Sequence, residues 1–318
     1  MIEVRELLKY YGEHRATGPL SFEIAKGEIV GLLGLNGAGK TTALRVLACD
    51  LLPSSGTVLV DGIDVVERPD EVRRRIGYLP DTPPLYDDMT VGEYLVFAAR
   101  LRGLGGREAK RRAAAACEST QLEDVREAPI SALSHGFRQR VGIAQAIVHA
   151  PRLLILDEPI SGLDPVQIIE MRELLRSLRG DHTILLSSHI LTEISETCDR
   201  LIVLGEGRIA MSGTEAELSR SVLGGAQTEV TIRSLDPTLA ERVLAAIDGV
   251  RRLERIAPRE PGEFVATFRL EADRDVRESI VRALVSEGIG LLEMVRSQHE
   301  LESIFLRLTA GGDEDVPS

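Results

Sequence analysis

The sequence of 318 residues contains no tryptophan, and only 3% of its residues are aromatic. It is also poor in cysteine. Cys49, Cys117 and Cys198 lie far apart and show no C-x-x-C spacing, which argues against a zinc site and against a disulfide framework. Thiols without a pairing pattern suit a reducing compartment.

Long hydrophobic runs and excess positive charge are missing as well. No apolar run approaches the roughly 20 residues that cross a bilayer, and residues 1–6 do not begin a hydrophobic leader. We therefore expect the protein to reach any membrane through another chain. The net charge of −12 argues against a nucleic-acid-binding surface, which is usually basic. The length and the 43% hydrophobic content suit two domains with sizeable cores.

One stretch organises the chain. Residues 34–41, Gly-Leu-Asn-Gly-Ala-Gly-Lys-Thr, fit the phosphate-loop pattern G-x-x-x-x-G-K-[ST] at every fixed position. Residues 28–33, which are mostly apolar, predict a buried strand before the loop, and residues 42–52 predict a helix after it. This context disfavours a chance glycine-rich turn. Such a turn at a helix N-terminus binds anions through its backbone N–H groups. We predict a nucleoside triphosphate site with Lys40 on the β- and γ-phosphates and the Thr41 hydroxyl on Mg²⁺. The remaining predicted cradle residues are Asn36, Gly37, Ala38, Gly39 and Thr42.

Alternating apolar residues ahead of the loop predict a small antiparallel sheet, and residues 56–62 predict a further strand. A helix is expected at 69–76 and a short strand at 77–80. The capping box at Thr90–Glu93 opens an inserted helical region, about 85–150, with an interruption at 103–106. Continuous apolar runs then predict buried parallel strands at 153–156, 183–186 and 201–204, and the last of these turns into a hairpin.

Gly224-Gly225 marks a candidate boundary, beyond which the pattern restarts. The following residues predict the order β-α-β-β-α-β of a ferredoxin-like unit, and residues 301–308 predict a last amphipathic helix. We therefore predict an α/β domain at 1–223, an accessory α+β domain at 226–309, and a disordered tail at 310–318. The accessory domain could serve in packing or in sensing a small molecule. Packing is favoured because no pocket residues stand out.

Two acidic residues follow the predicted strand 153–156. Asp157 lies at the strand end where open α/β sheets bind ligands, and its carboxylate could hold Mg²⁺ opposite Thr41. Glu158 could orient or deprotonate an attacking water. Alone, the pair could equally be a solvated strand end. The phosphate loop upstream favours the catalytic interpretation.

Residues 133–140, Leu-Ser-His-Gly-Phe-Arg-Gln-Arg, open a helix and would by themselves suit a simple helix cap. Together with the other motifs, they resemble the signature loop of ATP-binding cassette (ABC) proteins. The rest of that family's set follows in order over residues 1 to about 220. Tyr11 matches the aromatic residue that stacks on adenine, Asp81 falls at the Q-loop position, residues 161–164 match the D-loop, and His189 matches the switch histidine.

The resemblance implies an ABC ATPase core with an N-terminal antiparallel β subdomain and an inserted helical subdomain. It implies ATP and Mg²⁺ as ligands and two cassettes facing head to tail, so that the signature loop of one caps the nucleotide on the other. The implied catalytic residues are Lys40, Glu158 and His189. The implied metal site is Thr41, Asp81 and Asp157. The implied nucleotide contacts outside the phosphate loop are Tyr11, Ser134, Gly136, Gln139 and Asp164.

Two residues depart from the family pattern. Asp81 is shorter than the usual glutamine and charged, which puts its metal contact in doubt. His135 stands where many cassettes have Gly or Lys, and we expect little effect because the backbone around Ser134 and Gly136 should carry the phosphate contact.

Within the family, residues 73–80, 83–90 and 301–309 resemble the ATP-binding subunits of type-two exporters, including the gliding-motility type. This implies an ATPase at the cytoplasmic face of the membrane, bound to an integral-membrane permease on another chain and paired with a second cassette, as a homodimer or with a sister chain. A soluble cassette acting on nucleic acid or ribosomes is a weaker alternative, since the chain has one cassette, no heptads and an acidic charge. A regulator that binds ATP without hydrolysing it is the third hypothesis. The cargo cannot be read from this chain.

Overall fold

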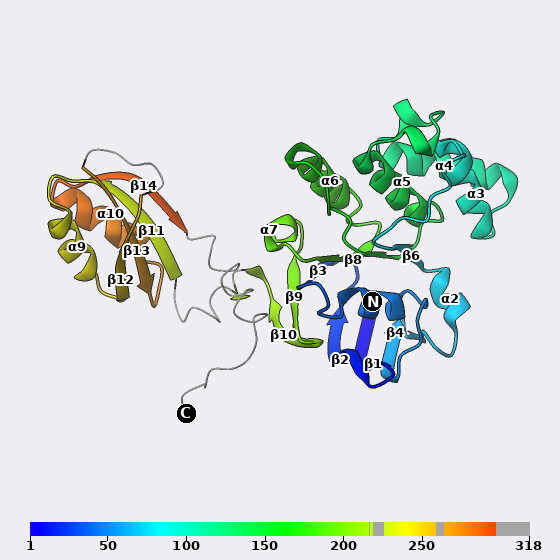
Figure 1. The fold of residues 1–318 in the computed structure, drawn as a ribbon, viewed down its shortest axis with the longest axis horizontal. Coiled ribbons are helices and arrows are strands. Elements are labelled where there is room, and N and C mark those ends of the chain that lie inside the picture. The colour runs from blue at the N-terminus through cyan, green and yellow to red at the C-terminus, as the bar shows by residue number, and fades with distance from the viewer. Residues whose placement is uncertain (216, 219–225, 259–263, 297–318) are drawn as a thin grey trace. The chain divides into compact units, whose positions relative to one another are not determined.

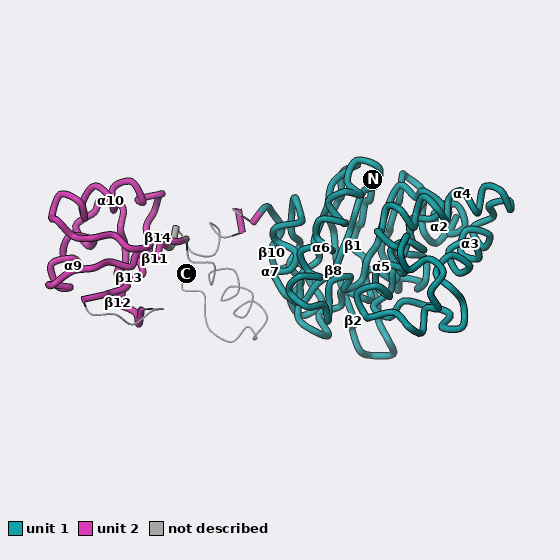
Figure 2. The backbone as a smooth tube through the Cα atoms, turned by 90° about the horizontal axis from the view of Figure 1, so that it is seen from above, with its two compact units in different colours: residues 1–214 teal, residues 215–318 magenta. Residues whose placement is uncertain are grey.

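The computed structural model describes residues 1–215, 217–218, 226–258 and 264–296. The chain divides into two compact units, residues 1–214 and 215–318 (Figures 1 and 2). The predicted boundary glycines, the predicted helix at 301–308 and the predicted tail lie outside the described residues. In the part that is described, no helix has both the length and the apolar character needed to cross a membrane.

An antiparallel sheet forms the beginning of unit 1, as the alternating residues predict. Ile2 and Val4 pair with Ile24 and Phe22, and all four side chains are buried on one face. A short fourth strand, which the sequence did not indicate, extends this sheet. Its spatial order is β2 (His14–Ile24), β1 (Ile2–Tyr11), β4 (Ser55–Val60) and β5 (Ile63–Asp64).

A six-stranded sheet forms the centre of unit 1. Its spatial order is β10 (Arg208–Gly213), β9 (Arg200–Gly205), β3 (Ile29–Gly34), β8 (Thr183–Ser188), β7 (Leu153–Leu156) and β6 (Ile76–Leu79). All neighbours are parallel except the β9–β10 hairpin. Strands β3, β7 and β8 are buried along their whole length, which explains why they read as continuous apolar runs.

This sheet positions the functional segments. Strands β3, β8 and β7 are adjacent and parallel, so their carboxyl ends meet at one edge. The phosphate loop follows β3, Asp157 and Glu158 follow β7, and His189 follows β8. The phosphate loop leads into α1 (Lys40–Leu47), whose Leu44 and Leu47 are fully buried.

Helices cover the rest of unit 1 (Figure 1). They are α2 (Pro69–Arg73), α3 (Val91–Leu101), α4 (Gly106–Ser119), α5 (His135–Ile147), α6 (Pro165–Ser177) and α7 (Leu191–Ile194). The predicted capping box is present, since Thr90 Oγ1 accepts from the Glu93 N–H and the Thr90 N–H donates to Glu93 Oε2.

Two helical predictions were too long. The helix expected at 69–76 ends at Arg73, because Ile76 already pairs with Leu153 in the sheet. In the inserted lobe, α4 and α5 are separated by two 3₁₀ turns, Glu123–Val125 and Ile130–Ala132. Pro129, just before the second turn, has no N–H to continue a helix.

Unit 2 has the predicted ferredoxin-like order. Its elements are β11 (Ala226–Arg233), α9 (Pro237–Ala245), β12 (Val250–Ile256), β13 (Val265–Ala272), α10 (Arg277–Ser286) and β14 (Gly290–Arg296). The sheet order is β12-β13-β11-β14, antiparallel throughout. Apolar residues of β11 and β13, including Val230 and Phe268, pack against Ile280 and Leu284 of α10. Asp236 caps α9 through the N–H groups of Thr238 and Leu239.

Candidate functional site

The phosphate loop requires glycine just before α1. Gly39 is the N-cap of this helix and has φ of +94°, a left-handed conformation that other residues adopt at a cost. A side-chain carbon at Gly39 would also lie 2.5 Å from the Ala16 carbonyl oxygen and 2.7 Å from Thr17 of strand β2. Only a glycine therefore suits position 39, both for its backbone conformation and because the loop backbone lies close against β2. The N-terminus of α1 remains open to an anion.

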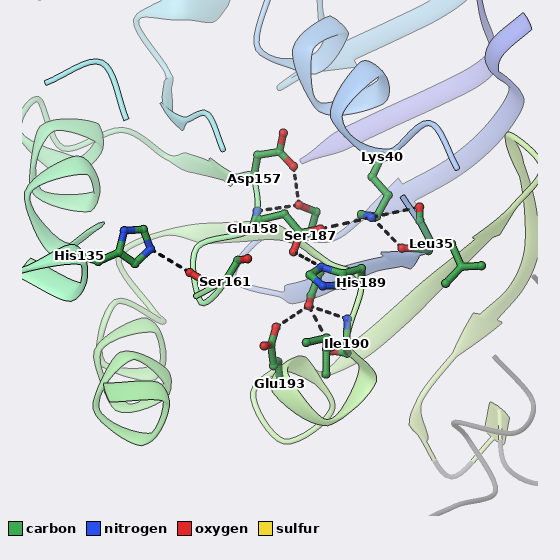
Figure 3. Close-up of polar contacts among 12 residues, drawn as sticks. Leu35, Lys40, His135, Asp157, Glu158, Ser161, Ser187, His189, Ile190 and Glu193 are labelled. Atoms are coloured by element: carbon green, nitrogen blue, oxygen red, sulfur yellow. Dashed lines mark hydrogen bonds and ion pairs between the residues drawn. The ribbon is translucent and has the colours of Figure 1, made fainter. Parts of the chain in front are cut away.

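Lys40 is the first residue of α1, directly after the loop glycine Gly39, and is only 5% exposed. Its Nζ donates to the carbonyl oxygens of Gly34 at 2.7 Å and Leu35 at 3.3 Å, and lies 3.3 Å from Glu158 Oε1 (Figure 3). The loop carbonyls and the glutamate thus hold a buried positive charge where a phosphate group would bind.

Ser187, near the end of β8, joins the two acidic residues after β7. Its Oγ donates to Asp157 Oδ1 at 2.6 Å and accepts from the Glu158 N–H at 2.9 Å (Figure 3). Ser187 is fully buried, so no water competes for this hydroxyl. One side chain therefore fixes both the Asp157 carboxylate and the backbone that carries Glu158.

Asp157 is 1% exposed, and burial raises the pKa of its carboxyl group. The Ser187 and Thr41 hydroxyls lower this pKa in part, whereas Glu158 and Asp81 raise it. Its Oδ2 has no hydrogen-bond partner among the described residues. A buried carboxylate oxygen without a partner, beside a hydroxyl and further carboxylates, is chemically suited to Mg²⁺.

The Glu158 carboxylate lies between the Lys40 side chain and the His189 ring. Its Oε2 accepts from His189 Nδ1 at 2.9 Å, and its Oε1 faces Lys40 (Figure 3). Glu158 has φ of +49°, a conformation that costs a non-glycine residue about 1 kcal/mol or more and that clusters at functional sites. This turn directs the side chain back toward the phosphate loop.

Lys40, Glu158 and His189 line a cavity of about 480 Å³. The predicted site residues that line this cavity are Tyr11, Asn36, Gly37, Gly39, Lys40, Thr41, Thr42, Asp81, Glu158 and His189. A neighbouring cavity shares Thr41 and Asp81 and is lined by Asp157 as well. Tyr11 is 48% exposed at the end of β1, and the Lys9 Nζ lies over its ring at 5.4 Å from the centroid. The Ala38 side chain is not part of the lining, and its N–H donates to the Leu35 carbonyl oxygen.

The predicted signature-loop residues Ser134, Gly136 and Gln139 lie outside this cavity, and so does Asp164 at the end of the D-loop. Ser134 is the N-cap of α5, and its Oγ accepts from the Phe137 N–H. Asp164 is the N-cap of α6, where its Oδ1 accepts from the N–H groups of Val166 and Gln167. Gln139 is only 2% exposed. Within one chain, the signature loop therefore does not meet the phosphate loop.

Several residues of this region were not among the predicted site residues. Ser187 carries the hydrogen bonds described above, and its position at the end of an apolar strand next to β7 was the available signal. His14 and Ala16 reach the cavity because β2 pairs with β1, where His14 faces Tyr11. Ser161 also lines the cavity, although only its D-loop motif was recognised.

Comparisons with known proteins show the family. The family described as "ABC transporter" matches residues 17–161. The Nod factor export ATP-binding protein I of Ralstonia nicotianae is 34% identical over 316 residues, covering 97% of this chain and 94% of the relative. The daunorubicin resistance ATP-binding protein DrrA3 of Streptomyces coeruleorubidus is 36% identical over 314 residues, covering 97% and 95%. The dimeric, post-hydrolysis structure of the cassette MJ0796 with ADP and Pi is 26% identical, with TM-score 0.61 over 67% of this chain and 98% of that one.

Proposed function

We infer the mechanism from a premise: this chain belongs to the ABC transporter family and is an ATP-binding subunit that hydrolyses ATP to drive a membrane transporter. We propose that hydrolysis takes place at a composite site between two cassettes and that the transporter is an exporter. The observation that carries this proposal is the position of Glu158, which lies between Lys40 and His189 at the mouth of the phosphate loop.

In this mechanism the phosphates bind at the N-terminus of α1, where the loop N–H groups and Lys40 compensate their charge. Tyr11 stacks on the adenine. Glu158 accepts a proton from the attacking water while the water oxygen bonds to the γ-phosphorus and ADP leaves. His189 orients the Glu158 carboxylate through Nδ1 and faces the γ-phosphate with its other ring nitrogen.

Magnesium would be held by Asp157 and the Thr41 hydroxyl, with Asp81 acting through water. Among the described residues, no group of three His, Cys, Asp or Glu side chains could hold a metal alone. This suits Mg²⁺, which usually keeps waters and binds one or two carboxylates together with substrate phosphates. The ion supplies neutralisation of the charge that develops on the phosphate oxygens.

The second half of the site comes from another cassette. Because Ser134 and Gly136 lie outside the cavity, we propose that they cap the nucleotide bound to Lys40 of a partner in a head-to-tail pair. We assign Gln139 and Asp164 to packing and helix capping instead, as their contacts within the chain support. Closing of this pair on ATP and its opening after hydrolysis would move a permease on another chain at the inner face of the membrane.

Export is the direction we propose, since a relative that aligns along nearly its whole length is named for the export of Nod factor. We also propose that residues 226–309 form an accessory packing domain, because their described part has its own core.

Affinity purification from native membranes tests the permease. A tagged Glu158→Gln chain with ATP should trap the closed pair and recover a polytopic membrane protein. The control is the same chain with Lys40→Ala added, which should lose the nucleotide and the trapped pair. Recovery of ribosomes or nucleic acid, with no membrane protein, would contradict the proposal.

A further inference from the structure

His135 makes a contact that a glycine could not make. Its Nε2 lies 3.1 Å from the Ser161 carbonyl oxygen in the D-loop (Figure 3). Because a carbonyl only accepts, the imidazole must donate, which both the Nε2–H neutral form and the imidazolium can do. The signature loop of this chain is therefore tied directly to its own D-loop.

Two further contacts continue this connection along α5 and α6. A side-chain carbon at Gly136 would lie 2.9 Å from Gln167 Oε1, so the bare backbone of the signature loop packs on α6. One turn further on, Arg140 and Glu170 form an ion pair at 2.5 Å, in which the arginine is largely buried. The first half of α5 is thus held to the D-loop at one place and to α6 at two.

The D-loop in turn leads to the general base. The Ser161 N–H donates to the Glu158 carbonyl oxygen at 3.2 Å, and Ser161 lines the cavity with Lys40 and His189. Two consecutive hydrogen bonds therefore connect His135 with the turn that carries Glu158. Since Glu158 has φ of +49°, this turn is one that its surroundings must hold in place.

We propose that His135 is a positioning residue that couples the two nucleotide sites of the pair. This proposal rests on the proposed function, in which Ser134 contacts the nucleotide bound by the partner while Glu158 acts on the nucleotide bound by its own chain. His135 keeps these two half-sites at a fixed distance, so that closure at one site aligns the general base at the other. The imidazole touches neither nucleotide in this account.

Two substitutions at the same position test this. His135→Phe keeps a planar ring without a donor, whereas His135→Gln keeps an N–H donor of similar reach. For His135→Phe we expect kcat to fall about three- to tenfold and the Hill coefficient for ATP to fall toward 1, with ATP affinity of the single chain within about twofold of the wild type. His135→Gln should keep at least about half of the wild-type kcat and its cooperativity.

The measurements are steady-state ATPase rates against ATP concentration, ATP binding without Mg²⁺ at protein concentrations low enough to keep the chains unpaired, and circular dichroism melting as a check on folding. Equal losses in the Phe and Gln variants, or a Phe variant with unchanged kcat and Hill coefficient, would overturn the role of His135 while the proposed function stands. A wild-type chain that hydrolyses no ATP as a pair would overturn both.

Discussion

Replacing Ser187 with alanine should damage both stability and catalysis, because one hydroxyl serves two acidic residues. The change removes the donor to Asp157 Oδ1 and the acceptor of the Glu158 N–H, both at a residue with no exposed surface. Neither group can turn to bulk water instead. The pKa of Asp157, already raised by burial, should rise further when the Ser187 hydrogen bond is lost.

The size of the effect follows from these two contacts. A buried polar group left without its partner costs about 1–3 kcal/mol, so two such groups give about 4 kcal/mol. For a unit of this size, about 2–4 °C of melting temperature correspond to 1 kcal/mol, which predicts a drop of about 8–16 °C. Because the Glu158 backbone loses its anchor, kcat should fall by about tenfold or more.

Melting by circular dichroism and steady-state ATPase rates measure both effects at a temperature where the variant is folded. Thr120→Val is the control, since it removes a fully buried hydroxyl that donates to the Ala116 carbonyl in the helical lobe, far from the site in sequence. It should cost about 1 kcal/mol and leave kcat unchanged. A Ser187→Ala chain with kcat within twofold of the wild type, or one no less stable than Thr120→Val, would refute this reasoning.

Two further predictions concern pH. Burial raises the pKa of the Asp157 carboxyl group above its value in the unfolded chain, so ionisation of Asp157 lowers the stability of the fold as pH rises past the unfolded value. Without Mg²⁺, Asp157→Asn should therefore melt at a higher temperature than the wild type at pH 7, and this difference should disappear toward pH 4. The same variant should lose Mg²⁺-dependent hydrolysis. Burial, and then the Arg102 charge, lower the pKa of His149 to about 4. As pH falls from 6.5 to about 4, this histidine is therefore protonated in the unfolded chain before it is protonated in the folded one. The free energy of unfolding of the wild type should fall by about 3 kcal/mol over this range. His149→Gln should show a flatter urea-unfolding profile over this range, and an unchanged slope would contradict the assignment.

Much of the architecture could be predicted from the sequence. The strands β3, β7 and β8 read as apolar runs because both of their faces are buried, and the motif after each one marks its carboxyl end. Parallel strands bring their carboxyl ends to one edge of a sheet. Once these three strands are assumed to be neighbours in one sheet, Lys40, Glu158 and His189 are therefore expected to lie close together. The structure supplies the reason for a glycine at position 39, since φ is +94° there and a side-chain carbon would clash with the Ala16 carbonyl oxygen.

Tertiary contacts decide the rest. Nothing in the residue types distinguishes Ser187, which holds Asp157, from Ser188, which donates to Glu193. Gln139 shares the signature stretch with Ser134, but the helical rotation of α5 turns its side chain into the interior. The role of His135 depends on a carbonyl 26 residues away, and only the tertiary structure brings the two together.

The central claim, a nucleotide site shared between two chains, is tested most directly by mixing two inactive variants. Lys40→Met should lose the phosphate contact, and Ser134→Arg should block the capping loop. In a random equal mixture, half of the pairs carry one complete site, which is a quarter of all sites. Hydrolysis should therefore recover to at most about a quarter of the wild-type rate, since the complete site has no active second site to couple to, with one ATP occluded per mixed pair. A mixture that recovers no hydrolysis and occludes no ATP, although the chains pair, would contradict the shared site.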